Sequence, residues 1–554
     1  MERPYDVGVP TAVDRPVRRT ALGQTLQGTP RPRLADRLRP LVDGQSRVSG
    51  WVWPTVVALL AALLRLWRLG TPNTVLFDET YYAKDGYSLL RFGYVRDTVE
   101  KADDMIVRGD MTGLFKPDTS FYVHPDVGKW LIAAGEWVFG MDSFGWRAAA
   151  AIVGALTVLV LARLVRRLTG STLLGCVAGL LLCFDGLHFV MSRLALLDVF
   201  LTFFLVLAAA CLAADRDWGR SRLARLAGDD GEAVAGFGPV RALLLRPWRL
   251  AAGVSFGLAC GTKWNAVFVL AGFGLLVWAW DCGARRAIGV RAPVRKATLV
   301  DAVPAFFSLV GVALVVYVAT WAGWLAHVHQ YEESFGSQWG SYLATDASGP
   351  AEAVQSLHSL WEYHRQVWDF HTGTGLEDAT HPYQSDPAGW LVINRPVGID
   401  ANTDIEPGQL GCQATDKCIE QILAIGTPVL WWAGAAALLA AVALWVGGRD
   451  WRYGLALVGV LSSWLPWMRY SERPIFYFYA VTVIPFTIVA LTLLLGRLLG
   501  PPGASRRRRA WGAAVLGTFV ALVIANFVFF WPILTDVLLS NEDWLDRMWF
   551  VRWI

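Results

Sequence analysis

Charged residues are scarce in this sequence of 554 residues. They make up 17% of the chain, against roughly 25% in soluble globular domains, whereas apolar residues make up 55%. A soluble chain of this length would form several domains, and each would need a charged surface. The composition therefore argues against a soluble enzyme, a disordered protein and a nucleic-acid-binding protein.

Cysteine and the common cofactor motifs are also rare or missing. Seven Cys do not make a disulfide framework. The sequence has no Walker loop, no Gly-rich phosphate cradle, no His-Glu-x-x-His motif and no Cys-rich metal set. These absences exclude a nucleotide-driven pump and argue against a zinc protease.

Long apolar runs, in contrast, are abundant. Eleven segments could cross a hydrocarbon core of ~30 Å, which predicts an all-α polytopic membrane protein with about eleven transmembrane helices. The eleven segments lie near residues 51–68, 146–165, 171–187, 190–214, 250–263, 264–281, 301–325, 426–447, 453–468, 475–496 and 510–533.

Basic residues set the expected orientation of these segments. Residues 1–50 carry nine Arg and six Pro and are expected to form a disordered tail. The loops on the same side as this tail are rich in Arg, so the positive-inside rule makes that side cytoplasmic. The loops 71–145 and 326–425 and the C-terminus are then external, and loop 326–425 has 14 acidic residues against three basic ones.

The predicted organisation has four parts. The first two are the cytoplasmic tail 1–50 and an N-terminal transmembrane module, 51–325, which carries external loop 71–145. The external region 326–425 and a C-terminal four-helix module, 426–554, complete the chain.

Ionisable and aromatic residues collect at the external ends of the spans, where such residues near lipid are functional candidates. Carboxylates could act as a general base, Arg and Lys could hold a phosphate, and aromatic rings could stack on a sugar. A phosphate-bearing substrate reached from the membrane fits this set best. The candidates are Asp78, Glu79, His124, Lys129, Arg147, Arg193, Lys263, Trp264 and Arg473, with His381, Tyr383 and Arg395 in the long loop.

Structural roles are the alternative for several of these residues. Asp78 and Glu79 could cap a helix, and Arg147 and Arg193 could be snorkelling anchors. Asp198 is harder to assign to a structural role, because it lies inside an apolar span. Arg193, five residues earlier, is its candidate partner.

At this point the sequence resembles the protein O-mannosyltransferases, polytopic enzymes of the GT-C glycosyltransferase class. The resemblance covers nearly all spans in order, and the tail and residues 381–396 are similar to the actinobacterial branch. Two departures are Asp126, where the family usually has Pro, and loop 326–425, which replaces a large luminal domain. The matching motifs are Phe77-Asp78-Glu79, HPDVGK at 124–129, Arg147, SRLALLDVFLTFF at 192–204 and GTKWN at 261–265.

The resemblance implies a donor, an acceptor and a reaction. The donor would be polyprenyl monophosphate mannose, and the acceptor a Ser or Thr of a secreted protein that is modified as it crosses the membrane, beside the translocation machinery. The anomeric carbon would invert, with Asp78 as the general base and Glu79 as its orienter. No other cofactor is implied; the paired acids would admit a divalent ion without requiring one. Transfer to a glycolipid or wall polymer, and a transporter, are the alternatives; the absence of internal repeats disfavours the transporter.

Cys412 and Cys418 lie in the external loop 326–425. An oxidising exterior and a five-residue spacer favour a disulfide between them, with two free thiols as the alternative. We expect this bond to order the loop and to take no part in catalysis.

Overall fold

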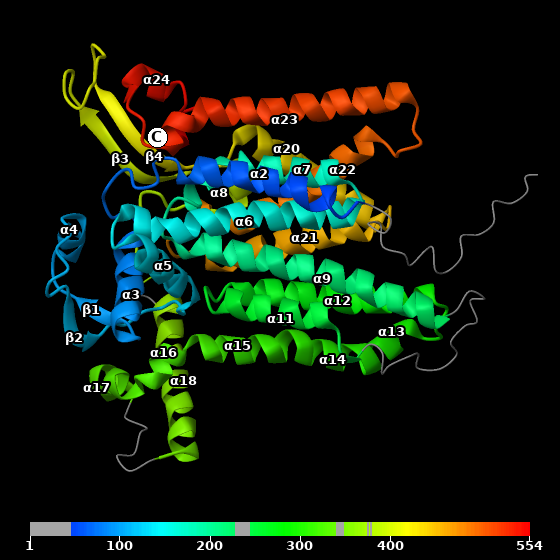
Figure 1. The fold of residues 1–554 in the computed structure, drawn as a ribbon, viewed down its shortest axis with the longest axis horizontal. Helices are drawn as coiled ribbons and strands as arrows, with labels where there is room; N and C mark the ends of the chain where they lie inside the picture. Colours follow the sequence, from blue (N-terminus) through cyan, green and yellow to red (C-terminus); the bar gives the residue numbers. More distant parts are fainter. Residues whose placement is uncertain (1–45, 228–243, 340–347, 374–375, 377–378) are drawn as a thin grey trace, which may run out of the picture.

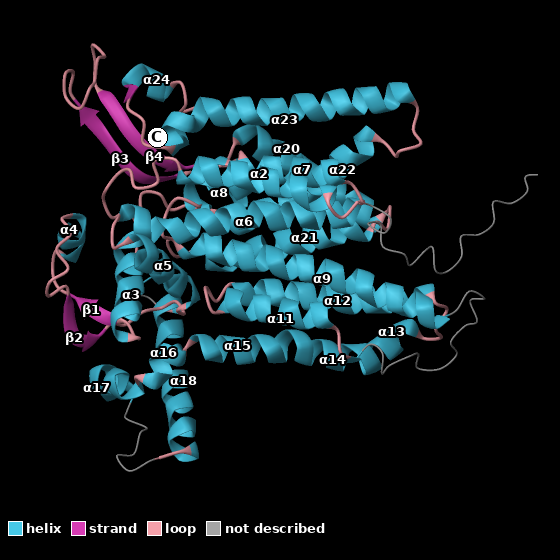
Figure 2. Cartoon of the chain, in the orientation of Figure 1, coloured by secondary structure: helices cyan, strands magenta, loops and turns pink. Residues whose placement is uncertain are grey.

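The computed structural model describes residues 46–227, 244–339, 348–373, 376 and 379–554. Long, roughly parallel helices form a bundle, and the shorter helices and both small sheets gather at one end of it (Figures 1 and 2). The described parts of segments 71–145 and 326–425 and the C-terminus lie at this end, which we call the loop end. The predicted tail 1–50 lies outside the described residues except for residues 46–50.

The bundle helices take their bounds from the apolar runs. They are α2 (Ser49–Leu66), α6 (Ser143–Thr169), α7 (Thr172–Cys183), α9 (Leu197–Ala227), α11 (Pro247–Cys260), α12 (Ala266–Ala287), α13 to α15 (within Pro293–Thr320), α20 (Pro428–Val446), α21 (Trp451–Trp464), α22 (Ile484–Leu499) and α23 (Arg506–Leu534). The loop-end helices are α3 (Glu79–Phe92), α4 (Ala102–Val107), α5 (Val127–Phe139), α8 (Gly186–Met191), α16 (Ala322–Ala326), α17 (Val328–Trp339), α18 (Pro350–Thr372) and α24 (Asn541–Leu545).

Each of the eleven predicted spans coincides with a helical segment, which confirms a mostly helical chain with many apolar helices. Among the described residues, seven helices are long and apolar enough to cross a membrane, and α7 and α22 are shorter apolar helices. The count of eleven crossings stays a prediction.

The fourth predicted span, 190–214, differs from the structure at both ends. The Asp185 side chain accepts a hydrogen bond from the His188 backbone N–H at 2.8 Å and starts the short helix α8, so α9 begins only at Leu197. At the other end, α9 runs on to Ala227, into the region expected to be a loop. Its charges are tolerated there because Asp215 pairs with Arg246 and Arg249.

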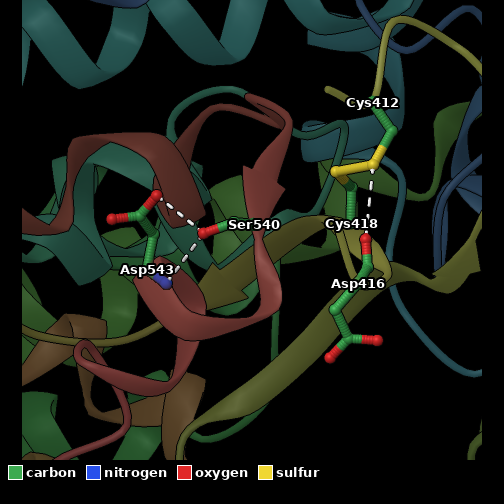
Figure 3. Close-up of a disulfide and its surroundings, with 5 residues drawn as sticks. All are labelled: Cys412, Asp416, Cys418, Ser540 and Asp543. Carbon is green, nitrogen blue, oxygen red and sulfur yellow. Dashed lines mark hydrogen bonds between the residues drawn. A yellow bond between two sulfur atoms is a disulfide. The ribbon is translucent and has the colours of Figure 1, made fainter. Parts of the chain in front are cut away.

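Two small antiparallel sheets add to the expected all-helical fold at the loop end. One contains β1 (Arg96–Thr98) and β2 (Phe115–Thr119). The other has the order β3 (Val397–Ile405), β4 (Cys418–Ala424), β5 (Leu539–Ser540), with Val397 opposite Ala424 and Cys418 opposite Ser540. Figure 3 shows that Cys412 and Cys418 form a disulfide where β4 begins, which ties the preceding loop to this sheet.

Buried aromatic rings join the two long loops to each other. The hydroxyl of Tyr363 in α18 lies 2.9 Å from both the backbone N and the carbonyl O of Tyr122, which precedes α5. Around this contact lies an aromatic cluster in which aromatic area is removed from water: Tyr122, Trp321, Trp324, Tyr331 and Tyr363. The cluster fixes segment 71–145 against segment 326–425, so a site at the loop end can draw on both.

Candidate active site

Glu79 and Arg147 form a fully buried ion pair. The Arg147 Nε and Nη2 atoms lie 2.8 Å from the two carboxylate oxygens of Glu79. The other guanidinium hydrogens bind the carbonyls of Leu69, Pro72 and Thr74. These five hydrogen bonds engage all three nitrogen atoms of the Arg147 guanidinium group. The expectation that Arg147 holds a phosphate does not fit these contacts.

The same ion pair fixes the backbone around Asp78. Glu79 also accepts hydrogen bonds from the backbone N–H groups of Leu76 and Ala195, at 3.0 and 2.9 Å. These contacts hold the start of α3 against the segment that contains Leu76 and against the segment that contains Ala195. Glu79 thus occupies the place that an orienter of Asp78 would take.

Asp78 is half-buried at the N-terminus of α3 and does not cap it through its side chain. Burial raises the pKa of its carboxyl to about 6; the charge on Asp198 raises this pKa too, whereas Lys263 lowers it. A carboxyl with such a pKa can accept a proton near neutral pH.

Lys263 and Asp198 form the cation–carboxylate pair next to Asp78. The Lys263 Nζ lies 3.0 Å from each Asp198 carboxylate oxygen and 4.3 Å from the centre of the Tyr479 ring. Burial lowers the pKa of Lys263, but the interactions with the Asp198 and Asp78 carboxylates outweigh it, and the pKa of Lys263 is raised above its usual value. Asp198 therefore pairs with Lys263, and the expected pairing with Arg193 is wrong.

Arg193 and Lys129 also have protein partners of their own. Arg193 donates to the carbonyls of Arg65, Trp67 and Arg68, which are left without intrahelical partners at the end of α2. Lys129 lies 3.1 Å from the Asp85 carboxylate and 3.5 Å from the centre of the Tyr122 ring. Neither cation lines the cavity described next.

A cavity of about 440 Å³ opens beside Lys263. Its polar end is lined by His124, Lys263, Trp264, His371, Tyr470, Arg473 and Tyr479. Its apolar wall comes from α12, the span that contains α15, and the 3-10 helix Leu465–Tyr470: Val267, Phe268, Leu270, Val310, Ala313, Leu314, Pro466 and Trp467. The cavity is thus cationic at one end and apolar along the rest.

Two neutral histidines and Arg473 shape the polar end. The rings of His124 and His371 stack with centres 5.6 Å apart. Burial lowers the pKa of both imidazoles, that of His371 to about 4, and the Lys263 charge adds to the effect in each. Arg473 donates from Nη1 to the His371 carbonyl at 2.9 Å, its Nε is buried without a hydrogen-bond partner among the described residues, and the residue lines the cavity. Lys263 and Arg473 are therefore the cations at the cavity wall.

The predicted outer-loop residues do not line the cavity. His381 packs edge-on against Phe476 and Phe77, with ring centres 4.9 and 6.1 Å apart. Arg395 lies over the Tyr383 ring and donates to the carbonyls of Arg552 and Ile554. Arg395 therefore anchors the C-terminal end, whereas His381 lies beside the residue that precedes Asp78.

Asp198, His371 and Tyr479 are site residues that the predicted set omits. The sequence does signal Asp198, through its position inside an apolar span. His371 and Tyr479 carry no comparable signal, because His371 lies near the end of an amphipathic helix and Tyr479 lies in an aromatic run. Within the described residues, no group of three or more His, Cys, Asp or Glu is arranged to hold a metal ion.

The bundle, the cavity and the loop-end site define the class of the protein: a multi-pass membrane protein with the GT-C glycosyltransferase fold. The S. cerevisiae protein O-mannosyltransferase Pmt1–Pmt2 complex bound to the sugar donor shares this fold, with a TM-score of 0.65 and 14% identity. That match covers 93% of this chain and 94% of the yeast chain.

Sequence comparison gives the family. The family model "Dolichyl-phosphate-mannose-protein mannosyltransferase" matches residues 55–222, and "C-terminal four TMM region of protein-O-mannosyltransferase" matches residues 356–553. The polyprenol-phosphate-mannose–protein mannosyltransferase of Mycolicibacterium smegmatis is 37% identical, with 92% of this chain and 93% of the relative covered. The relative of the same name from Corynebacterium glutamicum is 31% identical, with 92% and 94% covered. The chain belongs to the protein O-mannosyltransferase family and is a glycosyltransferase.

Proposed function

We propose that this enzyme transfers mannose from polyprenyl monophosphate mannose to Ser or Thr hydroxyls of secreted proteins, with inversion, at the external membrane face. The observation that carries the proposal is the cavity, whose wall is largely apolar and whose lining includes Lys263, the cation that also lowers the pKa of Asp78; Asp78 itself does not line the cavity. A lipid-linked sugar phosphate has the same division into a charged head and an apolar chain. The names of the relatives agree with this donor and with a protein acceptor.

The donor phosphate belongs at the polar end of the cavity. Lys263 supplies a point charge there and Arg473 a guanidinium fork. His124 and His371, both neutral, can hydrogen-bond to the phosphate or the sugar without adding charge. The polyprenyl chain would run along Phe268 and Leu314, which are themselves exposed toward the lipid.

Asp78 is then the general base. The acceptor hydroxyl oxygen attacks the anomeric carbon, and its proton passes to an Asp78 carboxylate oxygen. The bond from that carbon to the phosphate oxygen breaks, and its electron pair leaves with the phosphate. Because the leaving phosphate is already ionised, Lys263 and Arg473 stabilise it without a second catalytic acid.

Glu79 and Arg147 act on this chemistry through Asp78. Their buried pair holds the first turn of α3, so the Asp78 carboxyl is presented in one position. Such preorganisation lowers the barrier by removing reorganisation at the moment of reaction.

The external placement of this site follows from the charge of the loops. The N-terminus would be cytoplasmic and the loop end external, where secreted chains emerge from the translocation machinery. The domain limits 1–50, 51–325, 326–425 and 426–554 remain the proposed division of the chain.

The decisive experiment uses the purified full chain in lipid vesicles. Polyprenyl phosphate mannose is supplied with a Ser/Thr-rich peptide or with a membrane glycolipid, and the products are weighed by mass spectrometry. We expect one hexose on the peptide, with an α anomer if a β-linked donor inverts, and none with Asp78→Asn. Mannose on the glycolipid alone would replace the proposal with lipid glycosylation, and an unchanged donor would overturn it.

A further inference from the structure

Helix α18 leaves a stripe of apolar side chains exposed. Its members follow one another at intervals of three, four and seven residues, which places them on one face of the helix. The stripe consists of Val354, Leu357, Trp361 and Trp368, whose exposed fractions are 68, 46, 63 and 53%. No packed core of the described chain covers these side chains.

The rest of the helix surface is divided lengthwise into two parts. Leu360, Tyr363 and Val367 are buried against the aromatic cluster. Asp369, which is exposed, and Glu362, which is half-buried, lie on the flank beyond the stripe, and Arg365, four residues after Trp361 and three before Trp368, lies at the border between the two. The exposed half of α18 is therefore apolar along one side and charged along the other.

The C-terminal end of the stripe meets the apolar wall of the cavity. Trp368 lines the cavity together with Phe268 of α12 and Leu314 of the neighbouring span, and both of those side chains are exposed on the bundle surface. Figure 1 shows α18 crossing the end of α15 at a steep angle and continuing beyond the bundle. The stripe thus meets the exposed apolar surface of the bundle at Trp368.

We infer that α18 lies in the headgroup region of the bilayer, with its stripe against the upper acyl chains and its charged flank in water. Tryptophan favours this depth because the ring is apolar and its N–H can still reach water or headgroups. A helix with one apolar and one charged exposed side binds in the plane of the interface. The occupant of the stripe is the lipid surface, and this holds whichever sugar or acceptor the enzyme uses.

The helix also contacts the candidate site, so its position on the lipid bears on the cavity. The His364 Nε2 lies 2.6 Å from the Tyr317 hydroxyl, and the Trp264 Nε1 donates to that hydroxyl at 2.8 Å. The His364 and Trp264 rings stack with centres 5.4 Å apart. A helix held at the interface would therefore keep Trp264 at the cavity rim.

Spin labels on the full chain in phosphatidylcholine–phosphatidylglycerol vesicles test the placement. Leu357→Cys and Trp361→Cys report the stripe, and Asp369→Cys is the matched control on the charged flank. The free cysteines are first replaced by Ala: Cys176, Cys183, Cys211, Cys260 and Cys282. We expect the two stripe labels to collide more with oxygen than with a water-soluble nickel chelate, and the label at residue 369 to do the reverse.

Two results would overturn the inference. One is nickel access at residues 357 and 361 equal to that at residue 369, which would leave the stripe for a soluble partner. The other is strong dipolar broadening between stripe labels, which would assign it to a second copy of the chain. Because labelled variants could misfold, the unmodified chain is also treated with a lipid photoreactive near the top of its acyl chain. Crosslinks within residues 354–368 support the inference, and their absence contradicts it.

Discussion

The Nζ of Lys263 lies 3.0 Å from both carboxylate oxygens of Asp198, across 65 residues of sequence. The pair connects the turn between α11 and α12 to the first turn of α9, next to Asp78. Because Asp198 neutralises Lys263, the net attraction of this part of the cavity for a phosphate comes from Arg473, and Lys263 can add a hydrogen bond from its Nζ.

Variants of the Lys263–Asp198 pair should change the stability of the fold and the affinity for the donor independently of each other. Lys263→Met leaves the Asp198 carboxylate buried and unpaired, which typically costs about 3–5 kcal/mol of stability. The double variant Lys263→Met/Asp198→Leu should recover most of that loss, because both charges are gone, but should still bind the donor weakly. Thermal unfolding and donor titration check both points; full donor affinity in the double variant would remove Lys263 from the phosphate site.

Asp78→Asn keeps the shape of the side chain and removes its basicity. Turnover should fall by about 10²–10⁴-fold, the usual share of a general base, with little change in donor affinity. Single-turnover kinetics on preloaded donor measure the chemical step directly. If the variant turns over normally, the base is another carboxylate, and Asp126 and Asp198 are next to test.

The pH dependence should carry the signature of the same group. With a pKa of about 6, the Asp78 carboxyl is ionised above that pH, so turnover should fall as the pH drops through it. The contribution of Asp78 to the stability of the folded state depends on pH in the opposite direction. The usual pKa is 3.8, so this carboxyl stabilises the folded state most below that value, and the contribution is lost as the pH rises through about 6. At pH 7.5 the Asp78→Asn variant should therefore be no less stable than the parent chain. Its remaining turnover should no longer fall as the pH drops through about 6.

Arg473→Gln removes one of the two cations at the cavity wall. Loss of a charged hydrogen bond costs about 1.5–3 kcal/mol, so donor affinity should fall by roughly 10- to 150-fold. Arg395→Gln is the matched control, because Arg395 binds the C-terminal backbone and does not line the cavity. Equal donor affinities in the two variants, measured by titration in nanodiscs, would show that Arg473 has only a structural role.

Glu79→Gln should lower the stability of the fold and leave the donor affinity unchanged. The Arg147 guanidinium would lose its buried counter-charge, with a stability loss of about 3–5 kcal/mol. The folded fraction should bind donor normally and turn over slowly, because Asp78 is less well held. Donor affinity and single-turnover rate, measured separately on that fraction, check this; lost donor binding with intact stability would place the Glu79–Arg147 pair in the phosphate site.

Much of this protein can be predicted from its sequence because the signals are local. Each apolar run determines its own helix, since a helix satisfies its backbone hydrogen bonds internally. The sequence predicts Asp78 as a site residue from its place between the first apolar run and the next helix, and its catalytic role stays a prediction. The Cys412–Cys418 pairing follows in the same way from two residues close in sequence.

Which charges are free and which are paired was decided only by the tertiary structure. Arg147, Arg193 and Lys129 look like phosphate ligands in sequence, but folding brings each against carbonyls or carboxylates that were far away. Lys263 and Arg473 remain at the cavity because α12 and the segment after α21 pack around a space that other side chains do not fill. Sequence determines the type of each side chain and its height along a helix, whereas its partner depends on how distant helices pack, and a buried charge must find such a partner.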